Sequence, residues 1–223
     1  MQALTEDVGP QRSLVVVCAA WRGVSAAAAA ERWPNLTLKK IPKTVLDRCE
    51  WGHDDYSLNV ARLARSLAGV VRQNQAAAFT CGLIHGIGEL AIHLGVPEKA
   101  ALLDKDCDPL SPKRARAERR LLGYCYAQVG AGLARKWHFP QAMVDALEHQ
   151  YAPFDNNVYE PLAGVIHLAA WRVRAKEARM SSRQLAVSFP GPVGVVLGLD
   201  IDMVLQQDPI DWSVQTPGRA LVV

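Results

Sequence analysis

The stretch Phe79-Thr-Cys-Gly-Leu-Ile-His-Gly-Ile-Gly-Glu-Leu90 decides the fold of this 223-residue chain. From Phe79 to Leu94 nearly every residue is apolar or small, so the segment lacks the polar face of a surface helix. The pattern predicts a central helix covered by other helices and ending near Gly95 and Pro97. His85 interrupts the apolar run. A buried histidine needs hydrogen-bond partners, so it is either a satisfied core residue or part of a site.

A second helical pattern precedes this run. After Tyr56, apolar residues recur three and four positions apart while arginines and a glycine fall on another face, which predicts an amphipathic helix packed on a core. The apolar face consists of Val60, Ala64, Leu67 and Val71, and the other face of Arg62, Arg65, Gly69 and Arg72.

Residues 112–137 carry two stripes at helical spacing. The larger side chains are Leu122, Tyr126, Val129, Leu133 and Trp137, and the small ones are Gly123, Ala127, Gly130 and Ala134. Because small side chains let a neighbouring helix approach closely, we expect this segment to cross another core helix.

Helical patterns continue almost to the end of the chain. The predicted helices cover about 141–151 and 161–179, a short segment capped by Ser181 or Ser182, and a last segment near 193–197. No long alternating strand pattern and no internal repeat is present in the sequence, so the predicted fold is all-α.

Composition excludes several classes of protein. The five cysteines are scattered without a Cys-x-x-Cys pair, which is typical of reduced thiols in a cytosol and not of a disulfide or zinc framework. The apolar run from Ser13 to Ala20 is too short to cross a bilayer, so we expect no signal peptide and no membrane span. These features predict a cytoplasmic protein.

The net charge of +3 is too small to imply a nucleic-acid partner by itself. Basic residues gather at two places, Lys113, Arg114, Arg116, Arg119 and Arg120 in one and Arg172, Arg174, Lys176 and Arg179 in the other. Both are predicted to be solvated parts of helices. No aromatic residues interleave with the first cluster as they do in base-stacking surfaces, so nucleic acid is not an expected partner.

The run Gly82-Leu-Ile-His-Gly-Ile-Gly-Glu89 resembles the metal-binding run Gly-Leu-Leu-His-Asp-Ile-Gly-Lys of the HD superfamily. In that superfamily the adjacent His and Asp both ligate a metal, whereas here Gly86 stands at the Asp and Glu89 at the Lys. Four more stretches resemble, in the same order, the HDOD branch, the superfamily's regulatory and mostly non-catalytic relatives. They are Trp51 with Tyr56-Ser-Leu-Asn-Val-Ala61, Glu118 to Pro140, Ala146 to Gln150, and Leu162 to Ala170.

The resemblance implies that most of the metal ligands are lost. Tyr56 stands at the first His position, Gly86 at the Asp, Tyr126 at the third-motif His and Ala170 at the final Asp, leaving His85 and His149 as the matched ligands. Two neutral imidazoles without a carboxylate neither hold a divalent ion tightly nor offset its charge. We therefore expect no metal, no cofactor and no catalytic residues, and we take these six positions as the candidate ligand pocket.

The resemblance also implies an HD-superfamily helical bundle of the HDOD type. The family's module usually opens with a helical subdomain before the segment that Leu4-Thr-Glu-Asp-Val-Gly9 resembles, so we expect residues 1–207 to form an N-terminally shortened domain and 208–223 a tail. The chain is then either a fragment or a protein that has lost part of a family surface. An apolar face near Leu14 to Trp21 suggests self-association, and burial under neighbouring helices is the alternative.

Three functions stay open at this point. The first, implied by the resemblance, is a non-catalytic regulatory module of bacterial signal transduction that binds a partner protein. The second is a small-molecule sensor in which Tyr56, His85, Tyr126 and His149 line a pocket for a nucleotide or similar ligand. The third and weakest is a residual metal-dependent phosphohydrolase. An open polar pocket beside His85 would favour the sensor, and a filled one would favour the scaffold.

Overall fold

The computed structural model describes residues 56–207 and 209, apart from 110 and 155–158. Within these residues every regular element is a helix, which confirms the predicted all-α fold. In chain order the helices are α4 (Tyr56–Val70), α5 (Gln75–Ile84), α6 (Ile87–Gly95), α7 (Pro97–Asp106), α8 (Arg114–Leu122), α9 (Tyr126–Lys136), α10 (Gln141–His149), α11 (Pro161–Glu177), α12 (Ser182–Ser188), α13 (Gly191–Leu197) and α14 (Ile201–Gln206). The predictions for Leu14 to Trp21, for Trp51 and for the C-terminal tail fall outside the described residues.

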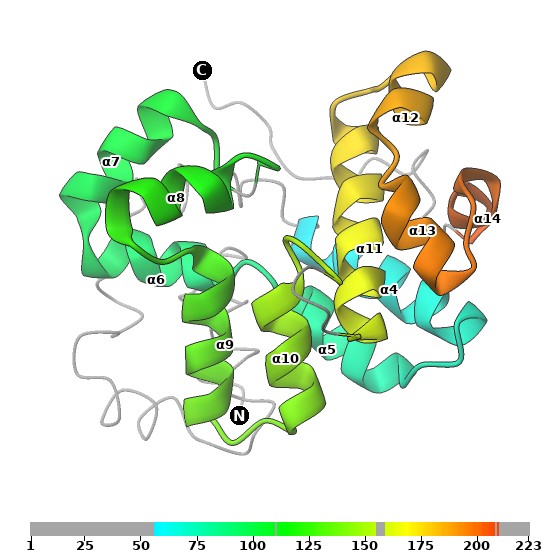
Figure 1. The fold of residues 1–223 in the computed structure, drawn as a ribbon, viewed down its shortest axis with the longest axis horizontal. Coiled ribbons are helices and arrows are strands. Elements are labelled where there is room, and N and C mark those ends of the chain that lie inside the picture. Colours follow the sequence, from blue (N-terminus) through cyan, green and yellow to red (C-terminus); the bar gives the residue numbers. More distant parts are fainter. Residues whose placement is uncertain (1–55, 110, 155–158, 208, 210–223) are drawn as a thin grey trace, which may run out of the picture.

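The helices form two groups joined through the middle of the molecule. Figure 1 shows α6, α7 and α8 at one end, α11 to α14 at the other, and α9 and α10 between them. Helix α4 packs on α5 and α11, α6 packs on α9, and α10 packs on α9 and α11. A large apolar core lies among α4, α5, α10 and α11, while a smaller one, built on Ile92, Ala100 and Ala115, lies under α7 and α8.

The amphipathic pattern after Tyr56 becomes α4 as predicted. Val60, Ala64 and Leu67 are completely buried, and Arg62 and Arg65 are exposed. Burial of this apolar face against α5 and α11 is what holds the helix in place, because isolated helices of this length are marginal in water.

The central run is not one helix, and that prediction was wrong. The chain turns at His85 and Gly86, which separate α5 from α6. Gly86 has φ −94° and ψ 2°, outside the helical region, and α6 starts afresh with its Glu89 amide donating to the Gly86 carbonyl at 3.0 Å. Gln75–His93 is long and apolar enough to cross a membrane, but 72% of its most apolar window is buried inside the molecule. It is a core segment.

Helices α6 and α9 cross at very close range. A Cβ added to Gly88 would collide with the carbonyl oxygen of Tyr126 and lie 2.9 Å from the amide nitrogen of Gly130. The small residues of α9 therefore face the core, as their stripe predicts. The segment 112–137 is nevertheless two helices, because Gly123 adopts a left-handed conformation with φ 83° that ends α8.

The remaining predicted helices form as expected, while two further helices, α7 and α14, were not predicted. Ser181 caps α12 through a reciprocal pair of contacts with Gln184. A further helix, α14, comes after the segment that was expected to be the last. Asp200 caps it by accepting a hydrogen bond from the Met203 amide at 2.8 Å.

Candidate functional site

His85 sits at the turn between α5 and α6 and is only 3% exposed. Its Nδ1 lies 2.7 Å from the Gly82 carbonyl oxygen, which accepts but cannot donate, so Nδ1 carries the proton of the neutral ring. The lone pair is then on Nε2, which is buried and has no hydrogen-bond partner within the described residues. Burial lowers the pKa of His85 to about 4, against the opposing effect of the Gly82 hydrogen bond, and the Arg174 charge lowers it further. The side chain is a neutral acceptor at pH 7.

A cavity of about 210 Å³ adjoins His85. Its walls come from the segment before α8, the start of α9, the end of α10, one face of α11 and the residues that follow α12. The polar side chains in these walls belong to His85, Ser111, Tyr126, Gln150, His167, Arg174 and Ser188. Apolar surface comes from Ile166 and Trp171 among others. The space is therefore an open, mixed polar pocket and not a packed core.

The structure brings several of the predicted site residues together. His85, Tyr126 and Ala170 line the cavity. Tyr56, the first residue of α4, packs against His85 with 5.6 Å between ring centroids. Gly86 adjoins His85 at the start of α6 but is not among the lining residues.

At the end of α10, Gln150 and not His149 reaches the cavity. His149 is half-buried and is not among the lining residues. The side chain of Gln150 donates from Nε2 to the backbone carbonyl oxygen of His85 at 2.9 Å. The backbone carbonyl oxygen of Gln150 accepts from Nδ1 of His167 at 2.8 Å. It thus ties the α5–α6 turn, α10 and α11 together around the cavity.

One face of α11 forms a wall of which the sequence interpretation identified only Ala170. His167, Ala170, Trp171 and Arg174 all line the cavity. Their spacing of three, four and seven residues from His167 is the signal that could have identified them as one face. Arg174 was predicted to be solvated, and that was wrong: it is half-buried and its charge acts on the pKa values of both cavity histidines.

Tyr126 and His167 are both uncharged at neutral pH. Burial raises the pKa of the Tyr126 phenol well above its usual value, although the Arg174 charge opposes this. Burial lowers the pKa of His167, against the opposing hydrogen bond to Gln150. Nδ1 of His167 donates to a carbonyl, so its Nε2 also holds a lone pair.

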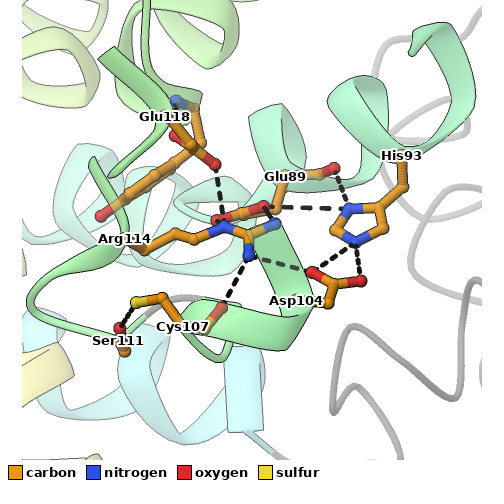
Figure 2. A network of polar contacts seen from close by, with 8 residues as sticks. Glu89, His93, Asp104, Cys107, Ser111, Arg114 and Glu118 are labelled. Atoms are coloured by element: carbon orange, nitrogen blue, oxygen red, sulfur yellow. Dashed lines mark hydrogen bonds and ion pairs between the residues drawn. The ribbon is translucent and has the colours of Figure 1, made fainter. Parts of the chain in front are cut away.

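A network of charged side chains lies behind the cavity wall (Figure 2). Arg114 was predicted to be solvated, but it is completely buried. Its Nε lies 3.1 Å from carboxylate oxygens of both Glu89 and Glu118, and its Nη1 lies 2.9 Å from Asp104. His93 contacts Asp104 through Nε2 at 3.1 Å. The pKa of Arg114 is raised because these three carboxylates outweigh the opposing effect of burial.

This network positions the start of α9. The second carboxylate oxygen of Glu118 accepts a hydrogen bond from the Tyr126 backbone amide at 2.6 Å. That amide is one of the unpaired donors at a helix N-terminus. The charged network therefore has a structural role, because it positions Tyr126, the first residue of α9 and a lining residue of the cavity.

The residues at the site do not fit the divalent metal that the HD superfamily holds. Of the positions compared with that superfamily, His85 alone places a metal-ligating imidazole or carboxylate in the cavity wall, beside a tyrosine and an alanine. Across the described residues there is no group of three or more His, Cys, Asp and Glu side chains placed to hold an ion. Divalent metals need such a set of ligands and a compensating negative charge.

Known proteins resemble this chain both in sequence and in fold. The profile of the HDOD domain matches residues 40–153. An uncharacterized protein of Treponema pallidum is 23% identical over 124 residues, which is 51% of this chain. The matched region covers only 22% of that protein's length.

Two solved structures share the fold. A proposed phosphohydrolase from Shewanella amazonensis aligns with a TM-score of 0.59 at 23% identity, covering 92% of this chain and 80% of that one. The response regulator MmoQ from Methylococcus capsulatus aligns with a TM-score of 0.54 at 22% identity, covering 78% of this chain and 68% of that one. Both likenesses concern the fold.

Proposed function

Because the chain belongs to the HDOD domain family, we propose that it is a non-catalytic regulatory domain that acts through a protein partner. The composition of the site carries this proposal. The cavity is lined by three residues that the family resemblance aligns with metal ligands, His85, Tyr126 and Ala170, and two of these three are not metal-binding types. Gly86, beside His85, replaces a further ligand in the same alignment. Without these ligands, the side chains that the described residues place at the site would not hold a metal that lowers the pKa of a bound water.

A role in bacterial signal transduction fits the neighbours' names. One structural neighbour is a response regulator, and both come from bacteria. Exposed apolar side chains, including Val187 on α12 and Val195 on α13 at 83% and 81% exposure, support a surface that meets another protein. The free thiols of Cys81 and Cys125 are consistent with a reducing cytoplasm.

The second candidate is a small-molecule sensor, and one observation favours it. The site is an open cavity of about 210 Å³ with several polar side chains in its walls. A pocket with a few convergent polar groups is the usual form of a ligand site. Ligand binding and partner binding are compatible, since a regulatory domain can respond to a ligand and report through a partner.

Hydrolysis is the activity to test, because one structural neighbour is named a proposed phosphohydrolase. The protein is assayed with added Mn²⁺ on p-nitrophenyl phosphate and on cyclic dinucleotides, with His85→Ala as the control. We expect no turnover above that control, and no stoichiometric iron, manganese or zinc in protein purified without chelator. Mn²⁺-dependent turnover that disappears in His85→Ala would contradict the proposal.

Restoring the missing carboxylate provides a sharper version of the same test. In Gly86→Asp a carboxylate stands beside His85, but tyrosine and alanine still occupy other ligand positions. We expect this variant to lose about 1–3 kcal/mol of stability, the range for a poorly compensated buried polar group, and to gain no hydrolysis. Urea unfolding and the same Mn²⁺ assays measure both outcomes.

A further inference from the structure

We propose that the cavity beside His85 binds a small organic anion, whose carboxylate or phosphate group contacts Arg174 and whose hydrogen-bond donor contacts Nε2 of His85. This inference deepens the sensor candidate described above and rests on it. It names the class of ligand that the walls of the cavity select.

The first step is the unpaired acceptor. Nε2 of His85 is buried, has no partner within the described residues, and bears a lone pair because Nδ1 is committed to the Gly82 carbonyl. Buried polar atoms in native proteins nearly always have a partner, and an orphan needs an explanation such as an absent ligand. His85 is among the residues that line the cavity, so a ligand with a hydroxyl, amino or protonated phosphate group could supply the missing donor there.

The second step is the charge of the cavity. Among the described lining residues, Arg174 is the one with a full charge, because burial keeps His85, His167 and Tyr126 neutral at pH 7. The carboxylates of Glu89 and Glu118, which also act on Tyr126, are not among the lining residues and contact Arg114 instead. The one formal charge among the described lining residues is therefore positive.

The third step is the geometry of a guanidinium. Arginine has five N–H donors arranged to match a carboxylate or phosphate, so a contact elsewhere in the protein leaves donors for a ligand. Arg174 and His167 are seven residues apart on the same face of α11, with Ala170 between them. The small alanine side chain leaves the floor of the cavity open at the place where the family resemblance puts a metal-ligating aspartate.

The fourth step is size. The cavity of about 210 Å³ exceeds the ~150 Å³ cavity that accommodates benzene. It is smaller than the ~300–1,000 Å³ of pockets that enclose drug-sized ligands. A whole dinucleotide is therefore excluded, while a compact metabolite with one anionic group fits, with Ile166 and Trp171 as its apolar wall.

Calorimetric titration with 4-hydroxyphenyl phosphate and with 4-hydroxybenzoate, in buffer containing EDTA, tests the inference and separates the two anionic groups. Each probe has one anionic group for Arg174 and one hydroxyl donor for Nε2 of His85. We expect saturable one-site binding of at least one probe. In Arg174→Gln we expect the dissociation constant to rise at least tenfold. Lys176→Gln removes the same charge from an exposed position of the same helix and should leave binding unchanged. His85→Phe keeps an aromatic ring but removes the acceptor, and should weaken binding as well.

Ala170→Leu fills the cavity without changing its charge and decides the matter if Arg174→Gln fails to fold. We expect it to abolish binding of both probes. The inference would be overturned if neither probe bound the natural chain at a concentration of tens of millimolar. It would also be overturned if Arg174→Gln and Ala170→Leu both bound the probes as tightly as the natural chain does. Neither result touches the regulatory proposal, whose non-catalytic part is tested separately by the Mn²⁺ assays.

Discussion

At the scale of the residue, the two ring nitrogens of His85 differ in their hydrogen bonding. Its Nδ1 is satisfied by its own helix and its Nε2 is not satisfied within the described residues. Protonating this ring at Nε2 places a charge in a site that is almost completely buried. Because burying the protonated ring costs free energy, the stability of the protein depends on pH.

We predict that stability falls between pH 7 and pH 4 and that His85→Phe reduces this fall. The pKa is about 4 in the folded protein and near its ordinary 6.5 in the unfolded chain. Between these values the unfolded chain binds more protons, so the free energy of unfolding decreases as the pH falls. The full effect is about 3 kcal/mol, at 1.36 kcal/mol for each unit of pKa.

Urea unfolding at pH 7, 6 and 5 measures the slope for both proteins. The exposed His138 provides the control, since His138→Gln should leave the slope as it is. Equal slopes in the natural chain and in His85→Phe would contradict the prediction.

At the scale of the element, the crossing of α6 and α9 depends on a missing side chain. We predict that Gly88→Ala destabilises the protein by about 1–3 kcal/mol or more, because the new methyl group would collide with backbone atoms that cannot rotate away. Gly132→Ala, on an exposed position of α9 with nothing near its Cβ, should be neutral or stabilising by up to about 1 kcal/mol. Thermal and urea unfolding of the two variants compare them directly, and equal effects would show that the close approach does not matter.

The elements also show what the sequence could and could not predict. Helices α4, α10 and α11 were predicted because their faces differ in polarity or their ends carry proline. The turn at His85 and Gly86 was not, since both halves of the run are buried and the apolar pattern does not change there. Helix α14 is only six residues long, too short for a periodic pattern.

The candidate site, like the helices, was predicted only in part from the sequence. Family resemblance pointed to His85, Tyr126 and Ala170, which all line the cavity. It gave His149 as the site residue at the end of α10, whereas Gln150 lines the cavity. Adjacent helical positions point in directions about 100° apart, and only the packing of α10 fixes which one faces inward. Arg174 was missed since a long cationic side chain in a basic stretch is usually solvated.

At the scale of the whole molecule, buried charges connect α6, α7 and α8 at one end of the fold. Arg114 on α8 reaches Glu89 on α6 and Asp104 on α7, and it also donates to the carbonyl oxygen of Cys107 at 2.7 Å. Figure 2 shows these groups converging from separate helices. The smaller core under α7 and α8 has few large apolar side chains, so much of its attachment depends on this single cation.

We predict that Arg114→Met destabilises the protein by about 3–5 kcal/mol, because it leaves three carboxylates close together without a counter-charge. Arg116→Met, at an exposed position of the same helix, should change stability by no more than about 0.5 kcal/mol. Urea unfolding of both variants at pH 7 is the measurement. Similar effects in the two would mean that the buried ion pairs add little beyond their hydrophobic equivalents.

The pairing of Glu89 with Arg114 also has an evolutionary consequence. Relatives that carry the superfamily's lysine at position 89 would bury two cations together if they also kept an arginine at position 114. Asp104 and Glu118 are the carboxylates that would pair with both cations, so we expect natural sequences with a lysine at position 89 to keep acidic residues at positions 104 and 118. The charge at position 89 would then divide natural sequences into two groups that can be told apart without their cavity residues.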